Sequence, residues 1–180
     1  MTPLYPPMPL GALWPEIILV LAACGVLLLS QARSPRLSAG VNWLALWSIV
    51  IAAVVVWLAP QLLRSPAEVV AGGGLVFDTL AGFVRISTLV LGLLLVLVAW
   101  SLPRASERAE FLAMLLLALV GLLLVGPADD LLTLFLALEL VSIPTYILLY
   151  LARTNESTQE AAIKYFLLSI FSSGLLLFGF

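Results

Sequence analysis

The sequence predicts an all-α protein, a polytopic bundle of about six transmembrane helices with its N-terminus outside. Of the 180 residues, 63% are hydrophobic and 10% are charged, whereas about 25% of a soluble globular domain is charged. The apolar residues form runs long enough to cross a hydrocarbon core about 30 Å thick. Basic residues concentrate in alternate connections between these runs, which orients the bundle. We therefore expect one transmembrane region over residues 1–180 and no soluble domain.

Several classes of partner and chemistry are excluded by composition. The net charge of −2 and the lack of a Lys/Arg cluster argue against a nucleic-acid partner. Histidine is absent and there is one cysteine, so no metal site and no haem or iron–sulfur cofactor is expected in this chain. With a mean hydropathy of +1.21, the expected surroundings are a lipid bilayer.

The first three expected spans cover residues 14–30, 41–59 and 76–100. Trp14, Pro15 and Glu16 are typical of a helix start, and we assign Glu16 to the helix N-terminus. The connection at residues 60–74 ends in three consecutive glycines and is expected to be flexible. Asp78 and Arg85 lie seven residues apart, on nearly the same helical face. They are interpreted as interfacial, with Arg85 reaching out toward water, and a functional pair is the alternative.

The last three expected spans cover residues 111–125, 129–151 and 158–180. Small residues such as Gly121 in the fourth span favour close packing of helices. Asp129 and Asp130 are assigned to the N-terminus of the fifth span. Ser157 and Glu160 have the spacing of a capping box, which predicts Ser157 as the N-cap of the sixth.

The orientation follows from the arginines. The connections after the first, third and fifth spans carry five of them, whereas the opposite side has only Arg64, with Arg85 inside a span. Because basic residues stay on the cytoplasmic side, these three connections are predicted to face the cytoplasm.

Glu139 is the strongest candidate for a functional residue. No other Asp, Glu, Lys or Arg lies between Asp130 and Arg153, so a helix here places Glu139 roughly 13 Å from Asp130, near the middle of the membrane. A carboxylate at this depth costs at least ~2.5 kcal/mol, and such residues usually belong to ion or proton paths. Ser142 lies three residues along on the same helical face and supplies a hydroxyl. Pro144 removes the backbone hydrogen bond to the Leu140 carbonyl, which leaves an acceptor beside the acid.

Lys164 is the second candidate, and two partners are open to it. Adjacent antiparallel spans would place it about 6 Å from Glu139 along the membrane normal, close enough for a contact or a bridging water. A coupled pair of this kind could shuttle a proton. Glu160, one helical turn before Lys164, offers an ordinary intrahelical ion pair instead.

A family resemblance rests on these same segments. Residues 128–148 (ADDLLTLFLALELVSIPTYIL), 160–169 (EAAIKYFLLS) and 173–179 (SGLLLFG) resemble the antiporter-like subunits of proton-pumping NADH:quinone oxidoreductase, respiratory complex I. The short connection before Lys164 is most similar to the subunit N family. The acid-bearing helix is also similar to Mrp-type cation/proton antiporters.

The resemblance implies a translocase subunit in a multi-pass arrangement in the bacterial inner membrane, with other membrane subunits of complex I as partners. It assigns proton translocation to Glu139 and Lys164, and leaves redox chemistry to other subunits. A subunit of an Mrp-type antiporter is the alternative. Family members have roughly fourteen spans, so the resemblance covers only an N-terminal portion of such a subunit.

Overall fold

The computed structural model describes residues 10–31, 35–62, 70–72, 74–100, 105–152 and 155–180. Within these residues it contains six long α-helices, each long and apolar enough to cross a membrane, which confirms the all-α, polytopic prediction. A 3-10 helix, η1 (Leu10–Leu13), leads into the first of them. The helices are α1 (Trp14–Gln31), α2 (Pro35–Leu62), α3 (Thr79–Ala99), α4 (Ala105–Val125), α5 (Leu131–Ala152) and α6 (Glu156–Gly179).

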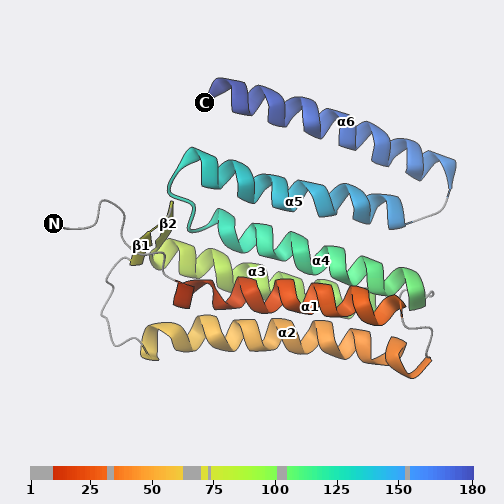
Figure 1. Ribbon diagram of the computed structural model, residues 1–180, viewed down its shortest axis with the longest axis horizontal. Coiled ribbons are helices and arrows are strands. Elements are labelled where there is room, and N and C mark those ends of the chain that lie inside the picture. The colour runs from red at the N-terminus through yellow and green to blue at the C-terminus, as the bar shows by residue number, and fades with distance from the viewer. Residues whose placement is uncertain (1–9, 32–34, 63–69, 73, 101–104, 153–154) are drawn as a thin grey trace.

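The helices lie side by side around α4 (Figure 1). α4 contacts α1, α2, α3 and α5, whereas α6 packs on α5 at the edge of the bundle. Burial agrees with this arrangement. In the apolar stretch of α4, 56% of the residues are buried, whereas in that of α6 only 6% are. The core therefore lies between α1, α2, α3 and α4, and α5 connects it to α6.

Gly121 allows α4 and α5 to pack closely, as its small size predicts. A Cβ atom at this position would lie 2.7 Å from the Val141 nitrogen and 2.8 Å from the Leu140 carbonyl carbon. These are backbone atoms, so any larger residue would force the two helices apart. The contact lies within two residues of Glu139 and fixes the distance between this part of α5 and the core.

A short hairpin precedes α3, at the glycines that the sequence suggested were a flexible connection. β1 (Val70–Gly72) pairs antiparallel with β2 (Leu75–Phe77), and Gly74 between them has a φ of 77°, which favours glycine. The Val76 N–H donates to the Pro127 carbonyl (2.7 Å), and the Asp129 N–H donates to the Gly74 carbonyl (2.9 Å). The expectation of flexibility is thus wrong for Gly74, because the turn is bonded to the α4–α5 connection.

Acidic and amide side chains cap three helices. Asp78 accepts from the Ala81 N–H (2.7 Å) at the start of α3, and Asp130 accepts from the Thr133 N–H (2.6 Å) at the start of α5. At α6 the N-cap is Asn155, which accepts from the Thr158 N–H (3.2 Å), so the prediction of Ser157 as N-cap is wrong. Asparagine and serine are about equally favourable N-caps, and the helix begins two residues earlier than the capping-box spacing indicated.

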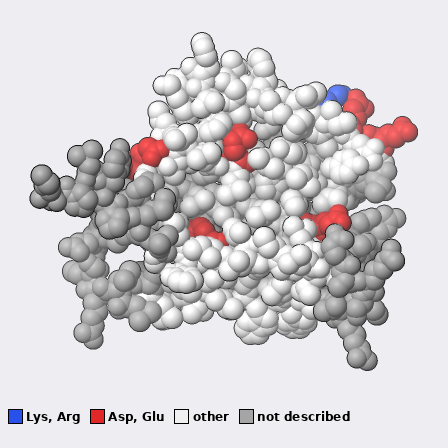
Figure 2. All heavy atoms as spheres, in the orientation of Figure 1, with Lys and Arg blue, Asp and Glu red and all other residues white. Residues whose placement is uncertain are grey.

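The described surface is almost without charge on the face that Figure 2 shows. On this face, scattered acidic groups and a small basic spot interrupt a broad field of uncharged side chains. Such a surface suits contact with lipid chains or with other apolar helices. Arg33, Arg64, Arg104 and Arg153, on which the predicted orientation depends, lie outside the described residues.

Candidate functional site

Glu139 lies in the middle of the bundle's length, half-buried between α5 and α6. It is eight residues beyond Leu131, where α5 begins, which corresponds to roughly 12 Å at ~1.5 Å per residue. α5 is one uninterrupted helix even though Pro144 lies within it. The helix predicted around the acid is therefore present, and the depth of Glu139 in a membrane stays a prediction from the sequence.

The partner of Glu139 is Ser173 of α6, which sequence reasoning missed. The Ser173 Oγ donates a hydrogen bond to Glu139 Oε1. Seven residues further along α5, the ring of Tyr146 packs edge-on against Phe166, with the ring centroids 5.0 Å apart. Because Phe166 is also seven residues from Ser173, the two contacts define one antiparallel register between α5 and α6.

One face of α6 is turned toward α5. Ala162, Phe166, Ser169 and Ser173 follow one another at spacings of four, three and four residues, which places them on the same side of a helix. Ala162 is the one buried residue of α6, and Phe166 and Ser173 make the contacts just described. Ser169, half-buried, lies between these two contacts.

Lys164 is on the other side of α6. It is nine residues from Ser173, which is two and a half turns of helix and about 13 Å along the axis. Its Nζ lies 2.5 Å from Glu160 Oε1, and both side chains are largely exposed, at 72% and 64%. Of the two partners open to Lys164, the structure therefore brings it to Glu160, and it does not bring it to Glu139.

Other polar groups near Glu139 are engaged within α5. The Ser142 hydroxyl donates to the Leu138 carbonyl (2.9 Å), and the Thr145 hydroxyl donates to the Val141 carbonyl (2.7 Å). Ser142 therefore lies near the acid, as predicted, while its hydroxyl bonds its own helix. This leaves Ser173 as the hydroxyl donor to Glu139 among the described residues.

A second charged pair, Glu16 and Arg85, lies at one end of the bundle. Arg85 Nη2 is 2.7 and 2.8 Å from the two carboxylate oxygens of Glu16 and donates to the Ala12 carbonyl (2.8 Å). Its guanidinium also lies over the Phe77 ring, 4.9 Å from the centroid. Both residues are buried, at 4% and 7% exposure, so the expectation that Arg85 reaches out toward water is wrong, and the Glu16 carboxylate is a partner of α3.

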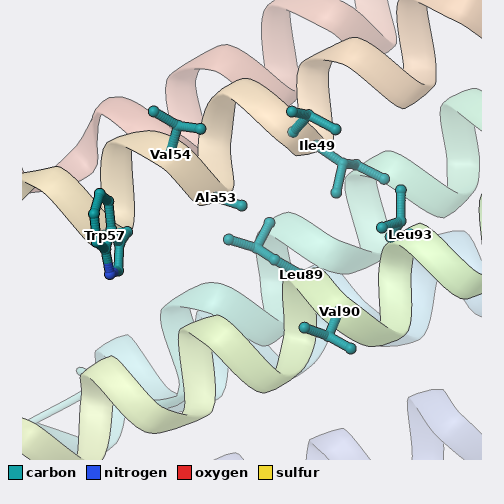
Figure 3. Close-up of a pocket in the computed structure, with 8 residues that line it drawn as sticks. Ile49, Ala53, Val54, Trp57, Leu89, Val90 and Leu93 are labelled. Carbon is teal, nitrogen blue, oxygen red and sulfur yellow. The ribbon is translucent and has the colours of Figure 1, made fainter.

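An apolar groove between α2 and α3 is separate from these charges (Figure 3). Its volume is about 290 Å³, and its eight lining residues include no ionisable side chain. Ile49, Trp57 and Leu89 are among the side chains that line it, with Trp57 toward one end. The groove offers no group that could hold or transfer a proton.

The chemistry open to the Glu139 site is therefore proton binding and release. A hydrogen bond to a charged group contributes roughly 1.5–3 kcal/mol, which offsets part of the cost of a carboxylate within the membrane. The serine hydroxyl both donates and accepts, so it can remain bonded whether Glu139 is ionised or protonated. A carboxyl that keeps a hydrogen-bond partner in both forms is chemically able to exchange a proton.

Known proteins share sequence similarity with this chain, including the segment that carries Glu139. Residues 128–180, which contain both Glu139 and Lys164, match the family model described as NADH:quinone oxidoreductase/Mrp antiporter, TM. NADH-quinone oxidoreductase subunit N of Azorhizobium caulinodans is 33% identical over 95% of this chain and 36% of that protein. The subunit N of Rhodospirillum rubrum is 34% identical over 94% of this chain and 35% of its own length.

A solved structure shares the fold. A chain in respiratory complex I from Thermus thermophilus, with bound aureothin, superposes with a TM-score of 0.73 at 26% identity. The match covers 92% of this chain and 35% of that one. The resemblance seen in the sequence is thus confirmed along nearly the whole chain, which spans about a third of the length of the relatives it matches.

Proposed function

We propose that this chain, a relative of subunit N of NADH-quinone oxidoreductase, forms part of a membrane subunit that moves protons while electrons pass from NADH to quinone. Glu139 is the residue that takes up and releases the proton. The observation that carries this proposal is the setting of its carboxylate, half-buried between two long apolar helices and bonded to a hydroxyl. Membrane carboxylates in such positions usually serve proton or ion paths.

The setting of this activity is proposed from the relatives. Their names place them in a multi-subunit oxidoreductase, so the partners of this chain are other membrane subunits of that complex. The redox cofactors are held by those other subunits, and the complex is located in a bacterial inner membrane. Lys164, paired with Glu160, lies eight residues beyond the start of α6, about 12 Å along the helix, and acts at a step distinct from that of Glu139.

The test is proton uptake by inverted membrane vesicles that contain the complete complex and the full-length subunit. Glu139→Gln removes the titratable group and keeps nearly the same shape. At equal complex content, we expect the protons taken up per NADH oxidised to fall by roughly half or more, because uptake requires the site to ionise. Glu156→Gln, in the exposed first turn of α6, is the matched control and should pump normally. Unchanged uptake in Glu139→Gln would rule out the proposed role.

The Mrp-type antiporter is the second candidate, because the family model that matches residues 128–180 includes it. The similarity to subunit N, however, extends along most of the chain. Sodium-dependent proton exchange without NADH, abolished by Glu139→Gln, would favour the antiporter. Uptake that requires NADH oxidation and is indifferent to sodium would favour the oxidoreductase.

A further inference from the structure

The hydroxyl of Ser173 has a different kind of partner from four other hydroxyls within the helices. Those of Ser30, Ser48, Ser142 and Thr145 each donate to a carbonyl three or four residues earlier in their own helix. This is the usual arrangement for a hydroxyl within a helix. Ser173 instead donates across the interface to the carboxylate of Glu139, 34 residues away in the sequence.

The register of the two helices holds Ser173 in this place. Tyr146 of α5 and Phe166 of α6 pack together at the same interface, two turns of helix from Glu139 and Ser173. Ala162, one turn before Phe166 on α6, is buried. On the other side of α5, Gly121 keeps the backbone of Leu140 and Val141 against α4. Glu139 therefore lies beside the close contact between α4 and α5, and its carboxylate bonds the hydroxyl of Ser173 on α6.

We propose that Ser173 is a second functional residue of this site, which acts as the hydrogen-bond partner of Glu139 in both of its protonation states. This inference rests on the proposed function of Glu139. When Glu139 is ionised, the Ser173 O–H donates to its carboxylate. When a proton adds to the carboxylate, the new acid O–H can donate to the Ser173 oxygen, and the serine neither gains nor loses a proton. The hydroxyl therefore satisfies both protonation states and keeps the exchange between them accessible.

Neighbouring serines provide the controls. Ser172 is adjacent, has the same side chain and is exposed, whereas Ser173 is half-buried and bonded to Glu139. Ser173→Ala removes the hydroxyl, Ser173→Thr keeps it, and Ser172→Ala removes one that does not face the acid. All three variants would be made in the full-length subunit within its complex, next to Glu139→Gln and the unchanged protein.

We expect Ser173→Ala to lower the protons taken up per NADH oxidised by a smaller factor than Glu139→Gln does, roughly 1.5-fold, since a hydrogen bond to a charged group is lost while the titratable group remains. It should also change the pH profile of uptake, which a purely structural loss would not do. Ser173→Thr should restore both properties, and Ser172→Ala should resemble the unchanged protein. Equal complex content and equal NADH oxidation with an artificial acceptor would exclude a folding defect.

The outcomes separate the inference from the proposed function. If Glu139→Gln impairs uptake but Ser173→Ala matches Ser172→Ala, the inference about Ser173 is wrong and the role of Glu139 stands. If Ser173→Thr is as impaired as Ser173→Ala at normal complex content, the hydroxyl is not the active group. If Glu139→Gln has no effect, the proposed function itself fails.

Discussion

Glu139 and Lys164 both lie in apolar helices, but their burial and their bonding partners differ. Glu139 is half-buried and faces α6, whereas the Lys164 side chain is 72% exposed and bonded within its own helix. An exposed ion pair contributes about 0–1 kcal/mol, so Glu160 and Lys164 do little for stability. The two candidates therefore act through separate contacts.

Separate contacts predict independent effects of mutation. Glu139→Gln and Lys164→Met should each lower proton uptake, and the double variant should show the product of the two losses within roughly a factor of two, as expected for sites more than ~10 Å apart. The measurement is NADH-driven uptake in vesicles at matched complex content. A double variant no worse than Glu139→Gln alone would show direct coupling, the alternative that the sequence left open.

The sequence identified Glu139 but not Ser173, for a physical reason. A lone acid far from both helix ends is visible in any apolar run, because its cost in lipid does not depend on the neighbouring helix. The partner depends on the register and rotation of α5 and α6, and a shift of two or three residues would bring a different side chain to the acid. The estimate of about 6 Å between Glu139 and Lys164 along the membrane normal was too small, because Lys164 lies about 13 Å along α6 from Ser173, the partner of Glu139. It also ignored the rotation that turns Lys164 away.

At the scale of the helices, the Glu16–Arg85 pair connects α1 to α3. The two residues are 69 positions apart, and each is close enough to a span's end to be interpreted as interfacial. Arg85 also reaches η1 through the Ala12 carbonyl and lies over Phe77 of β2. One guanidinium thus holds together the start of α1, the hairpin and α3.

A buried pair of this kind should be sensitive to the loss of either partner. We expect Glu16→Gln or Arg85→Met to destabilise the protein by about 3–5 kcal/mol, because the remaining group is left buried without its partner. Replacing both residues by methionine should recover much of this loss, since no unpaired charge remains. The thermal unfolding midpoint of the full-length protein in detergent measures both effects. A double variant less stable than either single variant would contradict this account.

Local signals in the sequence were read more reliably than contacts between elements. Asp130 was assigned to a helix N-terminus and caps α5, since capping involves only residues three positions away. Asp78 caps α3, although it was predicted to lie inside a span. The hairpin was missed because its strands have three residues each and obtain further hydrogen bonds from the distant α4–α5 connection. Its glycine serves a bonded turn that composition cannot distinguish from a flexible one.

For the whole molecule, hydropathy was sufficient to predict the helical class and the number of long apolar helices. In lipid every backbone polar group needs an internal partner, so an apolar run of this length forms a helix. The central position of α4 could not be predicted, because all six helices have similar hydropathy and only their contacts distinguish them. The orientation remains a prediction from the arginines.

The central claim is that Glu139 changes its protonation state when the complete complex works. The most direct measurement is the infrared difference spectrum between the NADH-reduced and oxidised complex, with the full-length subunit in place. We predict a carboxylic acid C=O band that shifts in D₂O, is absent in Glu139→Gln, and is retained in Glu156→Gln. A spectrum that Glu139→Gln leaves unchanged would contradict the claim, because the carboxyl would then keep a single protonation state throughout turnover.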